Sequence, residues 1–312
     1  MYEEFYGLSQ SPFSLTPDPN FFYRGESHLR AVELLRYGIH RGEGFIVVYG
    51  DIGTGKTTVC RTVLENLPQN LYTAFLLNPF LSETDLLRAI LRDFGVISQE
   101  NSSKPQPVSK DDLIMRLNAF LLSIAQLNGR ALVVIDEAQN LPIPTLEQIR
   151  ILSNLETHSQ KLLQIVLVGQ SELKEILGRP ELRQLNQRIS LRCELLPLSR
   201  EETAEYIQHR IRTASGGPSR VMFAAPAVKV IYDYSNGTPR LINLIADRCL
   251  ILGLASEKIS IDRKIAKEAV RNLELPKLRG LAKTTRITIV VVAAAILSVV
   301  LLWTITAGVL ER

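Results

Sequence analysis

The chain has 312 residues, a length that suggests one large globular unit or two modest ones. Hydrophobic residues make up 46% of the chain and charged residues 22%, a composition that excludes a disordered or fibrous protein. The formal charge is +4, from 36 basic and 32 acidic residues, and is too small to predict nucleic-acid binding by itself.

Short apolar runs alternate with segments of helical periodicity as far as about residue 196. This alternation predicts an α/β fold, with a parallel sheet covered on both faces by helices. The apolar, β-branched runs predicted as buried strands are 45–49, 72–77, 131–135, 162–168 and, from a weaker pattern, 189–195. The segments between them predicted as helices are 57–67, 84–94 and 112–127, and the polar stretch 99–110 is predicted as a surface loop.

A phosphate-binding loop is predicted directly after the first strand, because GDIGTGKT fits the pattern G-x-x-x-x-G-K-[ST] at every fixed position. Its glycines let backbone N–H groups point at phosphate oxygens, and the next helix offers its positive N-terminal end to the same anion. A dinucleotide-binding loop is excluded because Thr58 replaces the required third glycine. The residues predicted to bind ATP are Gly50, Asp51, Ile52, Gly53, Thr54, Gly55, Lys56, Thr57 and Thr58, with Lys56 on the β- and γ-phosphates and Thr57 on Mg²⁺.

An acidic pair ends the buried run ALVVID. A carboxylate at the carboxyl end of a parallel strand lies where open α/β sheets bind ligands. Asp136 is therefore predicted to hold Mg²⁺ beside Thr57, and Glu137 to act as general base on the attacking water. Gln170 follows the run LLQIVLVG and is predicted to orient the same water. The alternative is that all three residues only shape turns.

Three arginines are candidates for contact with phosphate. Arg183 and Arg188 precede the last predicted strand, where an arginine supplied to a neighbouring subunit stabilises charge on the γ-phosphate. The alternative for these two is a solvated basic helix face. Arg240 follows a predicted helix cap, Thr238, and lies in the first helical turn, where an arginine is disfavoured unless an anion compensates it. Bound nucleotide is predicted to be that anion. The predicted catalytic residues are Glu137, Lys56, Gln170, Arg188 and Arg240.

The strand pattern stops after Pro197, and the rest of the chain is predicted to be helical. Ser199 and Glu202 form a capping box that predicts a helix to about Ile211. Further helices are predicted at 226–234, 239–253 and 262–273. The predicted domains are an α/β nucleotide-binding domain at 1–196, an all-helical lid domain at 197–275, a basic linker at 276–286 and a transmembrane helix at 287–310.

The transmembrane prediction rests on residues 287–310, which carry no charge. A helix of that length is about 36 Å long, enough to cross a hydrocarbon core of ~30 Å. A buried core helix is the alternative, although such helices rarely lack a polar face over this length. Basic residues exceed acidic ones before the span, which predicts a single-pass protein of the inner membrane with residues 1–286 in the cytoplasm. These basic residues are expected to set topology, with attraction to anionic lipid as a by-product.

Cysteine and histidine spacing give no sign of a disulfide framework or a zinc site. Cys60, Cys193 and Cys249 have no paired spacing, and the four histidines form no ligand pair. A reducing compartment is therefore expected. The acidic N-terminus lacks a long apolar run, so no secretory signal peptide is expected there.

The order of the phosphate loop, acidic pair, Gln170, Arg188 and GTPR motif resembles that of an AAA+ ATPase. The opening FYGLSQSPFSLTPDPNFFY, His28, and the later VVIDEAQNL, LVGQSEL and NGTPRLIN are similar to the ExeA/GspA-type general secretion pathway ATPases over about residues 1–275. The resemblance implies an αβα sheet in the order 5-1-4-3-2, a helical lid, nucleotide between them, and self-assembly into a ring. It also implies that Arg188 acts across the subunit interface, with Gln170 as sensor one and Arg240 as sensor two.

Members of that group often continue past the membrane helix into a periplasmic peptidoglycan-binding domain. This sequence runs for two residues beyond the predicted helix, so that domain is not expected in it. The predicted function is a membrane-anchored ATPase, using ATP and Mg²⁺, that assembles or remodels an envelope complex of type II secretion or pilus type, with an envelope membrane protein as partner. One alternative is an AAA+ DNA-binding regulator of the transposition target-selection type. Another is a nucleotide-gated scaffold that barely hydrolyses, against which Glu137 argues.

Overall fold

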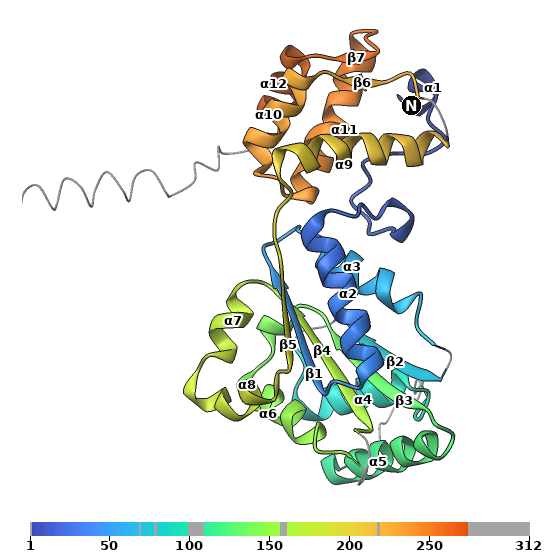
Figure 1. The fold of residues 1–312 in the computed structure, drawn as a ribbon, viewed down its shortest axis with the longest axis vertical. Helices are drawn as coiled ribbons and strands as arrows, with labels where there is room; N and C mark the ends of the chain where they lie inside the picture. Colours follow the sequence, from blue (N-terminus) through green and yellow to red (C-terminus); the bar gives the residue numbers. More distant parts are fainter. Residues whose placement is uncertain are drawn as a thin grey trace, which may run out of the picture. The chain divides into compact units, whose positions relative to one another are not determined.

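A computed structural model describes residues 2–68, 70–77, 80–98, 109–156, 161–216 and 219–273 (Figure 1). These ranges belong to one compact unit, Met1–Leu273. The predicted basic linker at 276–286, the predicted transmembrane helix at 287–310 and most of the predicted loop at 99–110 lie outside the described residues. Within the described ranges, no helix combines the length and the apolar character needed to span a bilayer.

A five-stranded parallel sheet forms the centre of the α/β region, and all five predicted strands are confirmed. Its order is β2-β3-β4-β1-β5, which is the implied order 5-1-4-3-2 read from the other edge. β1 and β4 are buried along their whole length and β3 almost so, because helices cover both faces, whereas the edge strands β2 and β5 are partly exposed. The strands are β1 (Phe45–Gly50), β2 (Leu71–Leu76), β3 (Arg130–Ile135), β4 (Leu163–Gly169) and β5 (Leu191–Leu195).

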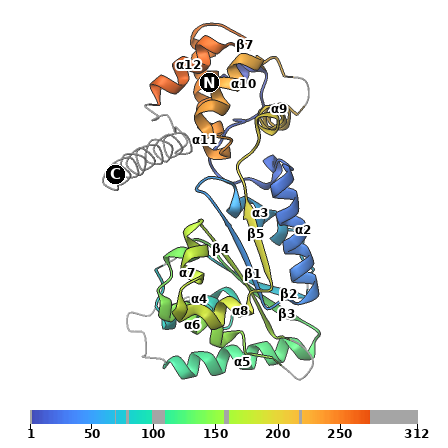
Figure 2. The same ribbon diagram turned by 60° about the vertical axis from the view of Figure 1, so that its left-hand side comes forward.

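The two faces of the sheet have separate apolar cores, because successive strand side chains point to opposite sides. Ile46 and Val48 pack with α2 (Glu26–Arg41) and α3 (Lys56–Leu64) on one face. Phe45 and Val47 pack with helices on the other face. Figures 1 and 2 show these helices on the opposite side of the sheet from α2 and α3. These helices are α4 (Glu83–Asp93), α5 (Lys110–Gln126), α6 (Ile143–Leu152), α7 (Glu172–Leu177) and α8 (Arg183–Arg188).

The segment after β5 is mainly helical. α9 opens with the predicted capping box of Ser199 and Glu202 and continues to Ser215, beyond the expected end near Ile211, before Gly216 ends it with φ 64°. The prediction of an all-helical segment is wrong in one respect, because two short strands pair in parallel. Two-residue strands are too short to show an alternating pattern in sequence. The elements are α9 (Arg200–Ser215), β6 (Met222–Phe223), α10 (Ala225–Ser235), α11 (Pro239–Ala255), β7 (Ser260–Ile261) and α12 (Arg263–Asn272).

The N-terminal segment contacts the late helices before it enters the α/β region. α1 (Tyr2–Tyr6) packs on α11, where the Tyr6 hydroxyl donates to the carbonyl oxygen of Leu250 at 3.2 Å. After α1, the Ser9 N–H donates to the carbonyl of Ala214 at the end of α9 (2.9 Å). Residues 14–23, which include the short helix η1 (Pro19–Phe21), then lead into α2; we call residues 14–23 the strap.

Candidate functional site

The phosphate loop turns sharply between β1 and α3. Gly53 and Gly55 have φ of 78° and 98°, a left-handed conformation that favours glycine. A Cβ at Gly53 would lie 2.7 Å from the Cβ of Arg240, so this position also needs glycine for the close approach of α11. The phosphate-loop motif did not predict this second requirement for glycine, which allows α11 to approach the loop.

The Lys56 side chain turns back into this loop. Its Nζ donates to the carbonyl oxygens of Gly50 and Asp51 at 2.8 and 2.9 Å, and the residue is only 6% exposed. Burial lowers the pKa of the Lys56 ammonium, while the carboxylates of Glu137 and Asp136 act in the opposite direction. A phosphate beside Lys56 would further favour its charged form.

Thr57 and Asp136 meet as the sequence predicts. Thr57 Oγ1 donates to Asp136 Oδ2 at 2.6 Å, and Asp136 is 3% exposed at the end of β3. A hydroxyl and a carboxylate oxygen in contact are ligands that Mg²⁺ takes when phosphates supply the rest of its coordination. The two residues therefore fit a magnesium ion shared with a nucleotide.

Glu137 follows Asp136 in a constrained backbone conformation. Its φ is 53°, in the left-handed region, which costs a non-glycine residue about 1–3 kcal/mol and persists where the surroundings enforce it. Its Oε2 accepts from Gln139 Nε2 at 2.7 Å and from Gln170 Nε2 at 3.1 Å. Glu137 and Gln170 are thus brought together as predicted, whereas Gln139 was not recognised from the sequence.

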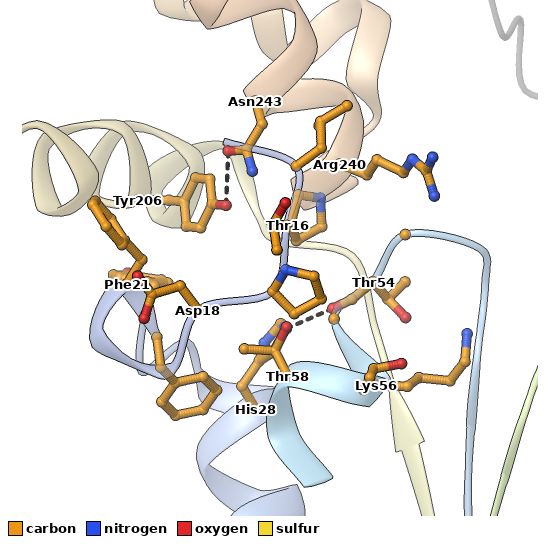
Figure 3. Close-up of a pocket in the computed structure, with 18 of the residues that line it drawn as sticks. Thr16, Asp18, Phe21, His28, Thr54, Lys56, Thr58, Tyr206, Arg240 and Asn243 are labelled. Carbon is orange, nitrogen blue, oxygen red and sulfur yellow. Dashed lines mark hydrogen bonds between the residues drawn. The ribbon is translucent and has the colours of Figure 1, made fainter. Parts of the chain in front are cut away.

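A cavity of ≈ 220 Å³ joins the phosphate loop to the strap and to the late helices (Figure 3). Among the predicted site residues, 52–58, Glu137, Gln170 and Arg240 line it. Within the described residues, Gly50, Asp51 and Asp136 do not line the cavity but contact Lys56 or Thr57. The structure thus places most of the predicted site around one space.

Arg183 and Arg188 are not among the lining residues in the described part of the chain. Arg188 Nη1 donates to Ser153 Oγ at 2.8 Å and to Asn154 Oδ1, next to the end of α6. Within one chain, therefore, the Arg188 side chain does not reach the cavity that Glu137 and Gln170 line. This placement leaves its predicted role across a subunit interface untested.

Arg240 joins α11 to the phosphate loop through its backbone. Its N–H donates to the carbonyl of Gly53 at 3.2 Å, which satisfies one of the free donors at the start of α11. Thr238 holds the N-cap position but makes no side-chain cap bond, so the predicted capping by Thr238 is wrong. A carbonyl from the phosphate loop provides the acceptor in its place.

The strap side of the cavity was missed in the sequence, because its contacts join distant segments. Arg210 is buried, stacks over the Phe21 ring at 4.7 Å, and donates to the Tyr206 hydroxyl at 3.0 Å. Tyr206 in turn donates to Asn243 Oδ1 at 2.8 Å (Figure 3). Arg210 also donates to the carbonyl oxygens of Pro12 and Ser14. Helical periodicity gave no signal for any of these contacts.

His28 also contributes to the site, although the sequence predicted no role for it beyond its place in the N-terminal motif. Its Nε2 donates to the carbonyl of Thr54 at 2.8 Å from a position that is 5% exposed (Figure 3). Burial lowers the pKa of His28, although the Thr54 bond and the Glu202 carboxylate oppose that shift. Through the bond to Thr54, His28 holds α2 against the phosphate loop.

Comparison with known proteins supports the assignment made from the motifs. Residues 39–177 match a family described as AAA domain. The chain is 43% identical over 259 residues to general secretion pathway protein A of Aeromonas hydrophila. This match covers 82% of the chain but 45% of the relative, so the chain spans about half the length of that curated protein. The resemblance to the general secretion pathway ATPases is thereby confirmed.

Solved structures agree on the fold. Cdc6p from Pyrobaculum aerophilum has a TM-score of 0.65 at 16% identity, covering 89% of this chain and 73% of that one. The Aeropyrum pernix ORC2 protein, solved as ADPNP-ADP complexes, has a TM-score of 0.59 at 15% identity, covering 84% and 71%. The Aeropyrum pernix ORC1 protein in complex with DNA has 0.60 at 17% identity, covering 86% and 70%. At these identities the likeness establishes the P-loop AAA+ fold alone.

Proposed function

We propose that this chain, which belongs to the AAA+ P-loop ATPases and is related to general secretion pathway protein A, hydrolyses ATP to assemble or remodel an envelope complex. The single observation that carries the hydrolytic part is the convergence of Lys56, Thr57, Asp136, Glu137 and Gln170 at the carboxyl edge of one sheet. A protein that only bound nucleotide would not need the carboxylate of Glu137 in the cavity lining.

Each residue has a distinct part in the proposed reaction. Lys56 would bind the β- and γ-phosphates, and Thr57 and Asp136 would hold Mg²⁺, which when bound would neutralise phosphate charge. Glu137 takes a proton from the attacking water, which Gln170 orients. ATP would occupy the cavity between the phosphate loop and α11, where Arg240 would contact its phosphates.

The contact of Arg240 with the phosphate loop supports the proposed coupling of hydrolysis to a larger assembly. A ligand shifts a conformational equilibrium only when it contacts the two states differently. Nucleotide in the cavity would touch both the phosphate loop and α11, and would therefore fix the lid domain at 197–275 against the domain at 1–196. We propose that neighbouring copies form a ring in which Arg188 acts on the γ-phosphate of the next subunit.

The proposed site of action is the inner membrane. The apolar segment 287–310 would anchor the chain as a single pass, with the ATPase part in the cytoplasm. The relative's name, general secretion pathway protein A, supports a secretion complex with an envelope membrane protein as partner. Fractionation of cells tests the anchor: the full chain should remain in the inner membrane after a salt wash, whereas a chain ending at residue 273 should not. Equal distributions would contradict anchoring.

A DNA-binding regulator is the second candidate, and one solved structure of the same fold is a complex with DNA. Purification of the full chain in detergent, with ATP and the Glu137→Gln substitution to trap the assembly, distinguishes the two. Envelope proteins in the purified complex would support the first function. Salt-sensitive binding of duplex DNA without such proteins would support the second.

The hydrolytic step is tested by comparing the wild-type chain with Glu137→Gln. We expect ATP to bind to both with similar affinity, while turnover by the variant falls by about 10²–10⁴-fold, the range for loss of a general base. Glu65→Gln, at an exposed position on the end of α3, is the control and should behave as wild type. Equal single-turnover rates in wild type and Glu137→Gln would favour a nucleotide-gated scaffold instead.

A further inference from the structure

Gln139 lies behind the cavity, in the short helix η2 (Ala138–Asn140) that follows Glu137. Its Nε2 donates to Glu137 Oε2 at 2.7 Å, and its Oε1 accepts from the backbone N–H of Gln170 at 3.0 Å. A backbone N–H can only donate, so the amide oxygen must face Gln170. The amide nitrogen therefore faces Glu137, and the orientation of Gln139 is fixed independently of how its two terminal atoms are assigned.

The Glu137 carboxylate is held on one side. Gln170 Nε2 donates to the same Oε2 at 3.1 Å, so this oxygen accepts from two side-chain amides. Within the described residues, no hydrogen bond is made to the other oxygen, Oε1. Two donors on one oxygen restrict rotation of the carboxylate and leave the second oxygen available to accept a proton.

The end of β4 is shaped to admit Gln139. A Cβ at Gly169 would lie 2.8 Å from Gln139 Oε1 and 2.8 Å from Leu173, so a larger residue there would displace the amide. The turn that follows is tied to the phosphate loop, because Ser171 Oγ donates to Asp51 Oδ1 at 2.9 Å. Gln139 thus bridges Glu137, with its left-handed backbone, to a turn that is itself fixed to the loop.

We propose that Gln139 is a positioning residue, which holds Glu137 Oε2 so that Oε1 is presented to the attacking water. Gln139 does not line the cavity within the described residues, whereas Glu137 does, so Gln139 acts through Glu137. The role rests on the proposed ATP hydrolysis. A base displaced by about 1 Å can lose about 10² in rate, which sets the scale of the expected effect.

Two substitutions test this role in the full chain with ATP and Mg²⁺. Gln139→Ala removes the amide, and Gln139→Glu keeps its shape while placing a second carboxylate beside Glu137. We expect kcat to fall about 10- to 100-fold in both, with the dissociation constant for ATP within about twofold of wild type. Gln126→Ala, at an exposed site on α5, is the control and should leave both quantities unchanged. An unchanged kcat in Gln139→Glu would overturn the proposal even if Gln139→Ala failed to fold.

A double-mutant cycle separates positioning from a general structural effect. Single-turnover hydrolysis is measured for wild type, Gln139→Ala, Glu137→Gln and the double variant. If Gln139 acts through Glu137, Gln139→Ala slows wild type but not Glu137→Gln. The same fold-decrease in both backgrounds would contradict positioning. If Glu137→Gln hydrolysed ATP like wild type, the proposed function would itself fail. A slow Glu137→Gln beside a normal Gln139→Ala would overturn this inference alone.

Discussion

The cavity has two walls of different origin. The sheet-edge wall consists of the phosphate loop, Glu137 and Gln170, all placed by turns that directly follow β1, β3 or β4, and Asp136 supports this wall through its contact with Thr57. The strap wall consists of residues 14–18 and 21–23 with Tyr206, Arg210 and Asn243. Its contacts join segments nearly 200 residues apart, as in the hydrogen bond from Arg210 to the carbonyl oxygen of Ser14. The proposed reaction chemistry belongs to the first wall. In the proposed function, the second wall would connect bound nucleotide to the parts of the chain that move.

This difference explains why the two walls respond differently to substitution. A change in the sheet-edge wall should alter turnover while the fold persists, because its residues lie at strand ends whose pairing is independent of their side chains. A change in the strap wall should alter stability or nucleotide affinity, because buried contacts such as Arg210 with Phe21 hold separate segments together.

After Glu137→Gln, the largest loss of turnover is expected on the sheet-edge side of the cavity, at Asp136. Asp136→Asn removes the negative charge next to Thr57, and Mg²⁺-dependent ATP hydrolysis should fall about 10²–10³-fold, as when a group that stabilises transition-state charge is lost. Steady-state hydrolysis over a magnesium titration measures it. Asp233→Asn, in an exposed pair with Lys229, is the control. If ATP hydrolysis by Asp136→Asn depended on magnesium concentration as in wild type, Asp136 would not be a ligand of the metal.

The next effect concerns the connection between α10 and α11. Gly237 has φ of 73°, and a Cβ there would lie 1.8 Å from the carbonyl oxygen of Leu198. Gly237→Ala should lower the free energy of unfolding by about 2–4 kcal/mol, from left-handed strain and the clash together. Urea unfolding measures this loss. Gly95→Ala shares a left-handed φ of 72° but meets no atom within 4 Å, so it should cost only about 1–2 kcal/mol. Equal losses of unfolding free energy in Gly237→Ala and Gly95→Ala would show that the backbone around Gly237 shifts to accommodate the added methyl group.

Arg240 joins the two walls, and its loss should have an intermediate effect. Arg240→Ala removes a charged donor from the cavity while the backbone bond to Gly53 remains. Affinity for ATP should fall about 10- to 100-fold, the value of a hydrogen bond to a charged group. Equilibrium titration with ATP measures it, and Arg263→Ala, exposed at the start of α12, is the control. Affinity unchanged in Arg240→Ala would exclude contact with phosphate.

The smallest effect is the pH dependence contributed by His28. Burial lowers its pKa in the folded chain, so the unfolded chain binds the proton more strongly. Its contribution to stability is therefore complete above about pH 6.5, the ordinary value for histidine, and is lost as pH falls towards the lowered folded value. His28→Gln keeps an amide donor for Thr54 without titrating, and should flatten the fall in unfolding free energy between pH 7 and 5. His209, whose pKa burial also lowers, would leave a residual slope. If the unfolding free energy fell equally with pH in wild type and His28→Gln, His28 would not contribute to the pH dependence of stability.

The sequence predicted those features whose cause is local. The strands and the positions of Lys56, Thr57 and Asp136 follow from apolar runs and a loop motif, which depend on neighbouring residues. The strap wall, the bond from Arg240 N–H to Gly53, and the pairing of β6 with β7 depend on tertiary contacts that leave no periodic signal. Gln139 was overlooked because a glutamine in a turn is ordinary, and only its two bonds in space give it a role.

The central claim is that ATP is bound and hydrolysed around the phosphate loop, and Lys56→Ala in the full chain tests it most directly. Lys56 Nζ lies within the loop and is buried there. ATP affinity measured by equilibrium titration, and turnover measured on the same preparation, should both fall sharply, while the unfolding transition shows that the chain is folded. Wild-type affinity and turnover in Lys56→Ala would contradict the claim.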